Sequence, residues 1–157
     1  MDSAGILGKL SAEFGADTIG ELQTERCDPF VVVPAEAIRA VARFLRDEAE
    51  LAFDYLMLVS GVDTGEGLLC VYHLYSLTHG HSFVLKCRLS YEHPELETVE
   101  DIWPAADWHE RETFDMMGIK FRGHHDLTRI LCPEDWDGHP LRKSYRQPEE
   151  YHGIAND

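Results

Sequence analysis

The chain has 157 residues, with 14 lysines and arginines against 29 aspartates and glutamates, so its formal net charge at pH 7 is −15. This length suits one domain, and the 44% apolar content supports a packed core. The acidity argues against binding nucleic acid or anionic lipid, because both require clustered basic residues. The longest apolar run, residues 55–59, is far shorter than the roughly 20 residues that span a bilayer. We therefore expect a soluble chain without a standard secretion signal.

The N-terminal third predicts two amphipathic helices with a strand between them. The first helix follows Ser3, a residue that can cap it, and ends near Gly15. Its apolar face is formed by Ile6, Leu7, Leu10 and Phe14. Residues 30–33 have strand character, and Pro34 suits the first turn of a second helix that ends near Asp47. The predicted buried stripe of this helix is Ile38, Val41, Ala42 and Leu45.

The middle of the chain predicts strands. Three β-like segments, 53–60, 68–77 and 83–89, are separated by short turn-rich stretches, which favours two antiparallel hairpins. A short helix is expected over 95–101, and a longer one over 104–117, ended by Gly118. The sequence thus predicts a single α+β domain, with an antiparallel or mixed sheet and helices on one side of it.

The C-terminal segment differs in composition from the rest. From residue 133 to 157 the aliphatic residues are Leu141 and Ile154, alongside several prolines and glycines, so this segment cannot build a core. We therefore divide the chain into an α+β core domain, 1–132, and an extended C-terminal arm, 133–157, which is either disordered or ordered against another protein. Residues 116–148 carry a net charge of +2, so the arm has a mildly basic root on an acidic body.

Four cysteines are dispersed along the chain, without the close spacing of a zinc or iron–sulfur site. We expect Cys27, Cys70, Cys87 and Cys132 to be small buried side chains. Cys70 and Cys87 lie on strands that are expected to pair, which leaves a cross-strand disulfide open, although it would not persist in a reducing cytosol.

The densest polar cluster runs from His109 to Glu112 on the predicted helix 104–117. Glu110 and Glu112 lie two residues apart and point in different directions on a helix, so they cannot act as a catalytic carboxylate pair. One interpretation is surface ion pairing, of Arg111 with Asp115 and of His109 with Glu112. The other is a helix with charges on two sides, one fixing the chain's own tail and the other a neighbouring protein.

Other catalytic or cofactor motifs are not recognisable. The pairs His79/His81 and His124/His125 lack the setting of a zinc site, so we expect them to be solvated. No serine lies in a nucleophile elbow, and the glycines between Gly61 and Gly67 match no phosphate-binding loop. We therefore expect no catalytic residue, cofactor or metal on this chain.

Three stretches, 102–124, 127–131 and 133–143, resemble the 30 kDa C-subunit of the proton-pumping NADH:quinone oxidoreductase, respiratory complex I. The most specific elements are Glu110-Arg-Glu112 followed by Asp115 and Gly118-Ile119, and then Gly138-His-Pro-Leu-Arg-Lys143. The resemblance covers about residues 53–146, with departures from the common pattern at His125, Thr128 and Ser144.

The resemblance implies a protein without a redox centre, in a complex that as a whole uses FMN, iron–sulfur clusters, NADH and quinone. The protein would belong to the peripheral part of the complex, on the cytoplasmic side of the cell membrane. It would lie there against the quinone-binding subunit (the D-subunit) and other peripheral subunits. The implied partner-interface residues are Glu110, Arg111, Glu112, Asp115, Arg129, Gly138, His139, Pro140, Arg142 and Lys143.

Two alternatives remain open at this point. Related membrane-bound hydrogenases and ferredoxin- or deazaflavin-linked complexes use a similar subunit with the same motif. A free-standing α+β hydrolase or metal enzyme is the second alternative, and it would use His109, Glu110, Glu112 and His139.

Overall fold

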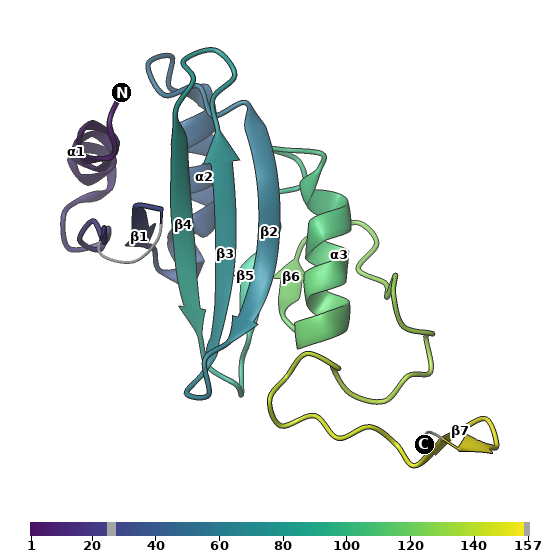
Figure 1. Cartoon of the computed structure of the whole chain (residues 1–157). Helices are drawn as coiled ribbons and strands as arrows, with labels where there is room; N and C mark the ends of the chain where they lie inside the picture. Colours follow the sequence, from purple (N-terminus) through teal and green to yellow (C-terminus); the bar gives the residue numbers. More distant parts are fainter. Residues whose placement is uncertain (25–27, 156–157) are drawn as a thin grey trace.

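The computed structural model describes residues 1–24 and 28–155, and its largest feature is a four-stranded mixed sheet (Figure 1). The strands, in spatial order, are β1 (Phe30–Val32), β4 (Ser82–Leu89), β3 (Leu68–Tyr75) and β2 (Tyr55–Asp63). Strand β1 is parallel to β4, whereas β4, β3 and β2 pair antiparallel through two hairpins. Both predicted hairpins and the α+β fold class are therefore confirmed.

The second N-terminal helix buries its whole predicted face, whereas the first buries Ile6 and Leu10 and leaves Leu7 and Phe14 partly exposed. Helix α1 (Ser3–Phe14) buries Ile6 and Leu10, and its cap is the Asp2 side chain rather than Ser3, because Asp2 Oδ1 accepts the Gly5 N–H at 2.9 Å. Helix α2 (Ile38–Asp47) follows a 3₁₀ turn, Ala35–Ala37, and packs behind the sheet (Figure 1). Its four predicted stripe residues are all buried.

The segment 95–101 is not a helix, contrary to the sequence prediction. Residues Glu95–Glu97 form strand β5, parallel to β6 (Lys120–Arg122), and a turn follows. The buried Leu96 lies opposite the buried Phe121, so pairing with a strand far along the chain overrides local propensity.

Helix α3 (Ala106–Met117) begins two residues after Pro104, which lies in the preceding turn. It ends where expected, at Gly118, whose φ of 70° is left-handed and suits glycine. The helix lies beside β2, and the C-terminal segment, which carries the small hairpin of β7 (Glu150–Tyr151) and β8 (Ile154–Ala155), runs past its end (Figure 1).

The described cysteines are free thiols. Cys70 and Cys87 are fully buried and lie directly opposite each other on β3 and β4, and burial raises the pKa of the Cys87 thiol to about 12. Cys132 is only half-buried, and Cys27 lies outside the described residues. In the described part of the chain, no helix is both long and apolar enough to cross a membrane.

Candidate functional site

Close packing of α3 against β2 places the charged motif at the edge of the sheet. The Thr113 hydroxyl points at the Val59 carbonyl, 3.5 Å away, and Met117 lies over Gly61. A Cβ at Gly61 would lie 2.7 Å from Met117 Cγ, so a side chain there would push the helix away. The approach of helix and strand therefore depends on this glycine.

Glu110 is fully buried on the inner side of α3. It therefore cannot contact a partner protein, although the family resemblance places it in the partner interface. Its Oε1 accepts the Val99 N–H at 2.9 Å, and its Oε2 accepts the Thr98 hydroxyl. Burial raises the pKa of this carboxyl to about 7, although both hydrogen bonds act in the opposite direction. Glu110 thus fixes the segment after β5 to α3.

Asp115, one turn further along, is also fully buried and binds Arg129 rather than Arg111. Its Oδ1 lies 2.7 Å from Arg129 Nη1, and its Oδ2 accepts the backbone N–H groups of residues 130, 131 and 132 at 2.7–3.1 Å. Burial favours a raised pKa for Asp115, but these donors and Arg129 outweigh it and hold the pKa below its ordinary value. The carboxylate thus organises the loop that leads into the arm.

The root of the arm binds the C-terminal end of α3. The carbonyls of Asp115, Met116 and Met117 have no partner within the helix and accept bonds from the arm instead. The donors are His139 Nδ1 at 3.0 Å, the Leu141 N–H at 3.1 Å and Arg142 Nε at 2.6 Å. Arg129 also donates to the Gly138 carbonyl, which precedes His139 and the half-buried Pro140. This part of the arm is therefore ordered on its own chain, and not only against another protein.

A second anchor lies at the end of β2. Asp63 Oδ2 accepts the Lys143 N–H at 2.8 Å, and its Oδ1 accepts the Tyr91 hydroxyl. The bond from Tyr91, followed by that from Lys143, lowers the pKa of Asp63. The backbone of Lys143 is thereby fixed while its side chain remains exposed.

The side chains on the outward side of α3 make fewer contacts with the rest of the chain. Arg111 donates to the carbonyl and hydroxyl oxygens of Thr128 and lies over the Trp108 ring, 5.1 Å from its centroid. Glu112 is exposed, and the described part of the chain contains no hydrogen bond between it and His109. The ion pairs predicted for Arg111 with Asp115 and for His109 with Glu112 are therefore wrong.

The prediction of solvated histidine pairs is only half right. His79 and His125 are exposed, whereas His81 is buried, with Nε2 2.8 Å from the Leu51 carbonyl. The His124 side chain is fully buried, and its Nε2 lies 3.4 Å from carboxylate oxygens of both Glu100 and Asp107. These contacts were missed because their partners lie 17 to 30 residues away in the sequence.

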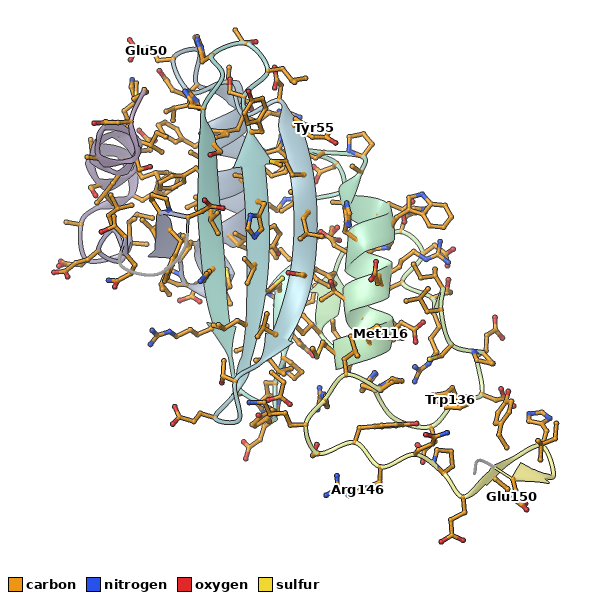
Figure 2. All side chains as sticks on the ribbon, in the orientation of Figure 1. Glu50, Tyr55, Met116, Trp136, Arg146 and Glu150 are labelled. Carbon is orange, nitrogen blue, oxygen red and sulfur yellow. The ribbon has the colours of Figure 1, made fainter. Side chains whose placement is uncertain are left out.

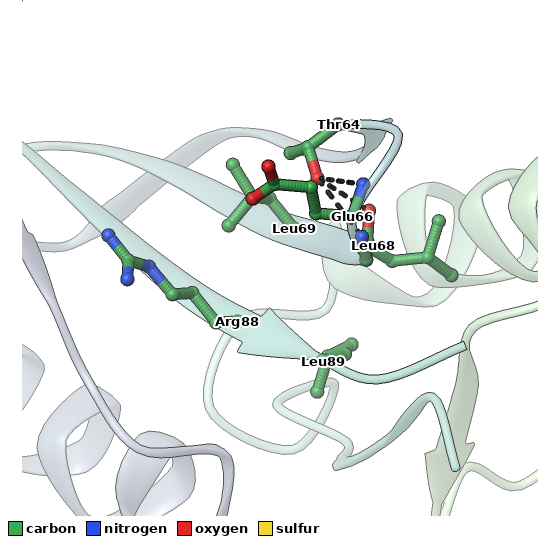
Figure 3. Close-up of a pocket in the computed structure, with 7 residues that line it drawn as sticks. Thr64, Glu66, Leu68, Leu69, Arg88 and Leu89 are labelled. Atoms are coloured by element: carbon green, nitrogen blue, oxygen red, sulfur yellow. Dashed lines mark hydrogen bonds between the residues drawn. The ribbon is translucent and has the colours of Figure 1, made fainter. Parts of the chain in front are cut away.

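Several shallow hollows lie on the described surface. Figure 3 shows one at the turn between β2 and β3, where the Thr64 hydroxyl accepts the N–H groups of Glu66 and Gly67. Arg88 and Glu66 are the charged side chains that line it. Within the described residues, potential metal ligands converge at Glu100, Asp107, His124 and His125. This group contains none of the residues of the metal-enzyme alternative, which are His109, Glu110, Glu112 and His139.

Comparison with known proteins gives a consistent result. Residues 31–151 match the family model described as respiratory-chain NADH dehydrogenase, 30 Kd subunit. The NADH-quinone oxidoreductase C-subunit of Chloroherpeton thalassium is 47% identical over 148 residues, covering 92% of this chain and 61% of that protein. The protein of the same name from Chlorobium phaeobacteroides is 41% identical, covering 90% of this chain and 87% of that protein.

Solved structures agree with the sequence comparisons. A trypsin-resistant fragment of Nqo5 superposes with a TM-score of 0.64 at 28% identity, over 77% of this chain and 98% of that one. A chain of the membrane-bound sulfane sulfur reductase, an archaeal respiratory membrane complex, gives 0.72 at 28% identity, over 91% of this chain and 85% of that one.

Proposed function

Because the chain belongs to the family of the 30 kDa subunit of respiratory-chain NADH dehydrogenase, we propose that it serves as that subunit in an NADH:quinone oxidoreductase. In this role it carries no redox centre. It supports the quinone-reducing module beside the quinone-binding subunit, while FMN, iron–sulfur clusters, NADH and quinone are bound by other proteins of the complex. It reaches the cytoplasmic side of the membrane through those proteins, which fits its charge of −15.

The observation that carries this proposal is the anchoring of the arm by α3. Asp115, Asp63 and the last carbonyls of α3 all bond to the stretch from 129 to 143, and none of these bonds requires a partner protein. Figure 2 shows Met116 at the end of α3 that faces the arm, and Trp136 within the arm. A preorganised arm loses less conformational entropy on association, which favours a docking role.

The same region exposes large apolar side chains. Trp108 on α3 is 63% exposed, and Leu131 and Leu141, whose backbone N–H groups bond to Asp115 and Met116, are 61% and 58% exposed. The buried centre of a protein interface is more apolar than its rim, and tryptophan is enriched there. We expect these three side chains to contact the quinone-binding subunit, together with the exposed faces of Arg111, Glu112 and Lys143.

The test is co-expression of the full chain with the quinone-binding subunit from the same organism, followed by affinity capture. Trp108→Ala should reduce the captured complex at least about tenfold, since truncation of a buried interface tryptophan costs on the order of 2 kcal/mol. Leu77→Ala is the matched control, because Leu77 is 68% exposed but lies in the turn after β3. Equal capture of both variants and the wild type would refute the proposed interface.

A second candidate is the equivalent subunit of a related respiratory membrane complex, which the TM-score of 0.72 to a chain of the sulfane sulfur reductase complex favours. Purification from the native membrane, with identification of the accompanying proteins, separates the two. NADH-binding and flavin-binding subunits in the purified assembly support the first candidate, and their replacement by hydrogenase-type or ferredoxin-linked subunits supports the second.

A further inference from the structure

Four potential metal ligands from three separate segments meet on the side of α3 that faces β5 and β6. Glu100 lies in the turn after β5, Asp107 in the first turn of α3, and His124 and His125 in the loop after β6. One ligand atom from each of the four lies within 4.8 Å of the others. Two imidazoles and two carboxylates are a donor set that suits zinc.

The spacing of these atoms fits a tetrahedral ion. Zinc bonds to nitrogen and oxygen of about 2.0–2.1 Å place tetrahedral ligand atoms about 3.4 Å apart. His124 Nε2 lies 3.4 Å from Glu100 Oε2 and 3.4 Å from Asp107 Oδ1. The contact between His125 Nδ1 and Glu100 Oε2 is shorter, at 2.8 Å, which is the length of a hydrogen bond that an ion would replace.

Two further features distinguish this cluster from an ordinary surface group of charges. Asp107 Oδ1 is buried and accepts no hydrogen bond, although buried carboxylate oxygens normally have a partner. The His124 side chain is fully buried, and its ring stacks on that of His125, with centroids 5.2 Å apart and planes within 11°. The cluster thus contains both an unsatisfied acceptor and a rigidly held imidazole.

We propose that Glu100, Asp107, His124 and His125 bind one divalent zinc-like cation. The ion would join the loop after β6 to α3 and to the segment after β5. This structural role is separate from the proposed docking of the arm, and the ion would take no part in electron transfer. Both imidazoles bind through unprotonated nitrogens, so the proton on His125 Nδ1 leaves the contact with Glu100. In a neutral His125 ring this proton moves to Nε2, and a doubly protonated ring releases one proton to solvent. At His124 the ring proton moves from Nε2 to Nδ1. Two hydrogen bonds are then lost, the 3.3 Å bond from Nε2 to the Asp107 carbonyl and the 3.1 Å bond from the Asp126 N–H to Nδ1.

The ion has a route to this position from solvent. Glu100, Asp107 and His125 line an open hollow together with Asp101 and Pro104, and the His125 side chain is 66% exposed. The fold does not need to open for zinc to reach the ligands, so binding to the folded chain is expected to be fast and reversible by a chelator.

The test is calorimetric titration of the chelator-treated full chain with Zn²⁺, repeated with Co²⁺, whose visible absorption reports tetrahedral coordination. We expect one equivalent to bind to the wild type. His125→Ala and Asp107→Asn should each weaken binding by at least about 100-fold, since loss of a direct ligand exceeds the 10–100-fold cost of losing an outer-shell partner. Circular dichroism establishes that both variants are folded.

A matched control is His152→Ala, which removes an exposed histidine that pairs with a single carboxylate, Asp135, at 2.7 Å. It should bind zinc as the wild type does. Absence of zinc binding in the wild type, or undiminished binding in folded His125→Ala and Asp107→Asn, overturns the proposal. Since the isolated chain is used, neither result depends on whether the quinone-binding subunit is the partner.

Discussion

Asp115 and Arg129 form an ion pair whose carboxylate is fully buried and whose guanidinium is 13% exposed, with 2.7 Å between Oδ1 and Nη1. The pair joins the last turn of α3 to the loop that enters the arm. Because Arg129 also donates to the Gly138 carbonyl, one side chain connects the helix, the loop and the arm. The buried Asp115 carboxylate is therefore one of the anchors of the arm, beside the Asp63 carboxylate and the last carbonyls of α3.

Asp115→Asn should destabilise the chain by about 3–5 kcal/mol, because it leaves the Arg129 charge desolvated without its counter-charge. Urea unfolding of the purified chain measures this. Glu112→Gln is the control, since Glu112 is an exposed acid on the same helix. A loss below about 1 kcal/mol for Asp115→Asn would show that the pair behaves like a surface ion pair.

Glu110 predicts a dependence of stability on pH. Its pKa in the fold is about 7, above its ordinary value of 4.5, so the folded state binds the proton more tightly. This contribution is complete below pH 4.5 and is lost as the pH rises through about 7, up to about 3 kcal/mol in total. Glu110→Gln stays neutral and should lack this loss. The free energy of unfolding of both proteins is measured by urea unfolding at pH 5 and pH 8, with a chelator present to remove metal ions. An equal change in this free energy between the two pH values for both proteins would contradict the prediction.

The Asp63 anchor predicts a change in protease sensitivity. Asp63→Ala removes the acceptor for the Lys143 N–H and the Tyr91 hydroxyl, so trypsin should cleave after Arg142, Lys143 or Arg146 several times faster. Asp54→Ala is the control, because Asp54 also accepts a backbone N–H, from Leu77, but lies away from the arm. Fragment masses identify the cleavage sites, and equal rates in the two variants would exclude the anchor.

The basic root of the arm predicts salt-dependent docking. Replacing Arg142 and Lys143 together by alanine should lower the association rate with the quinone-binding subunit if the arm meets an acidic surface, and the difference should shrink as salt rises. Surface plasmon resonance across a NaCl series measures it. Lys9→Ala on α1, at the opposite end of the molecule from the arm, should leave the rate unchanged (Figure 1). A decrease in the association rate that stays the same at every salt concentration would contradict the prediction. It would indicate that the variant has lost the bond from Arg142 to the Met117 carbonyl, which holds the arm on α3.

Local sequence determined the elements whose signals lie within a few residues of each other. The stripe of α2, the two hairpins and the end of α3 at Gly118 follow from periodicity, turn residues and a left-handed glycine, which operate over one or two turns of chain. The motif from Glu110 to Lys143 likewise identified the family. For these features the physical cause is local, so the order of residues was enough.

Tertiary structure decided the partners of the charged side chains and the state of segment 95–101. Spacing on a helix favours Arg111 as the partner of Asp115, but the loop brings Arg129 and three backbone N–H groups to a carboxylate that burial has cut off from water. Strand β5 exists because β6 lies beside it, and Glu100 meets His124 only because both strands end there. Such contacts depend on how distant segments pack, and the identity of neighbouring residues does not encode them.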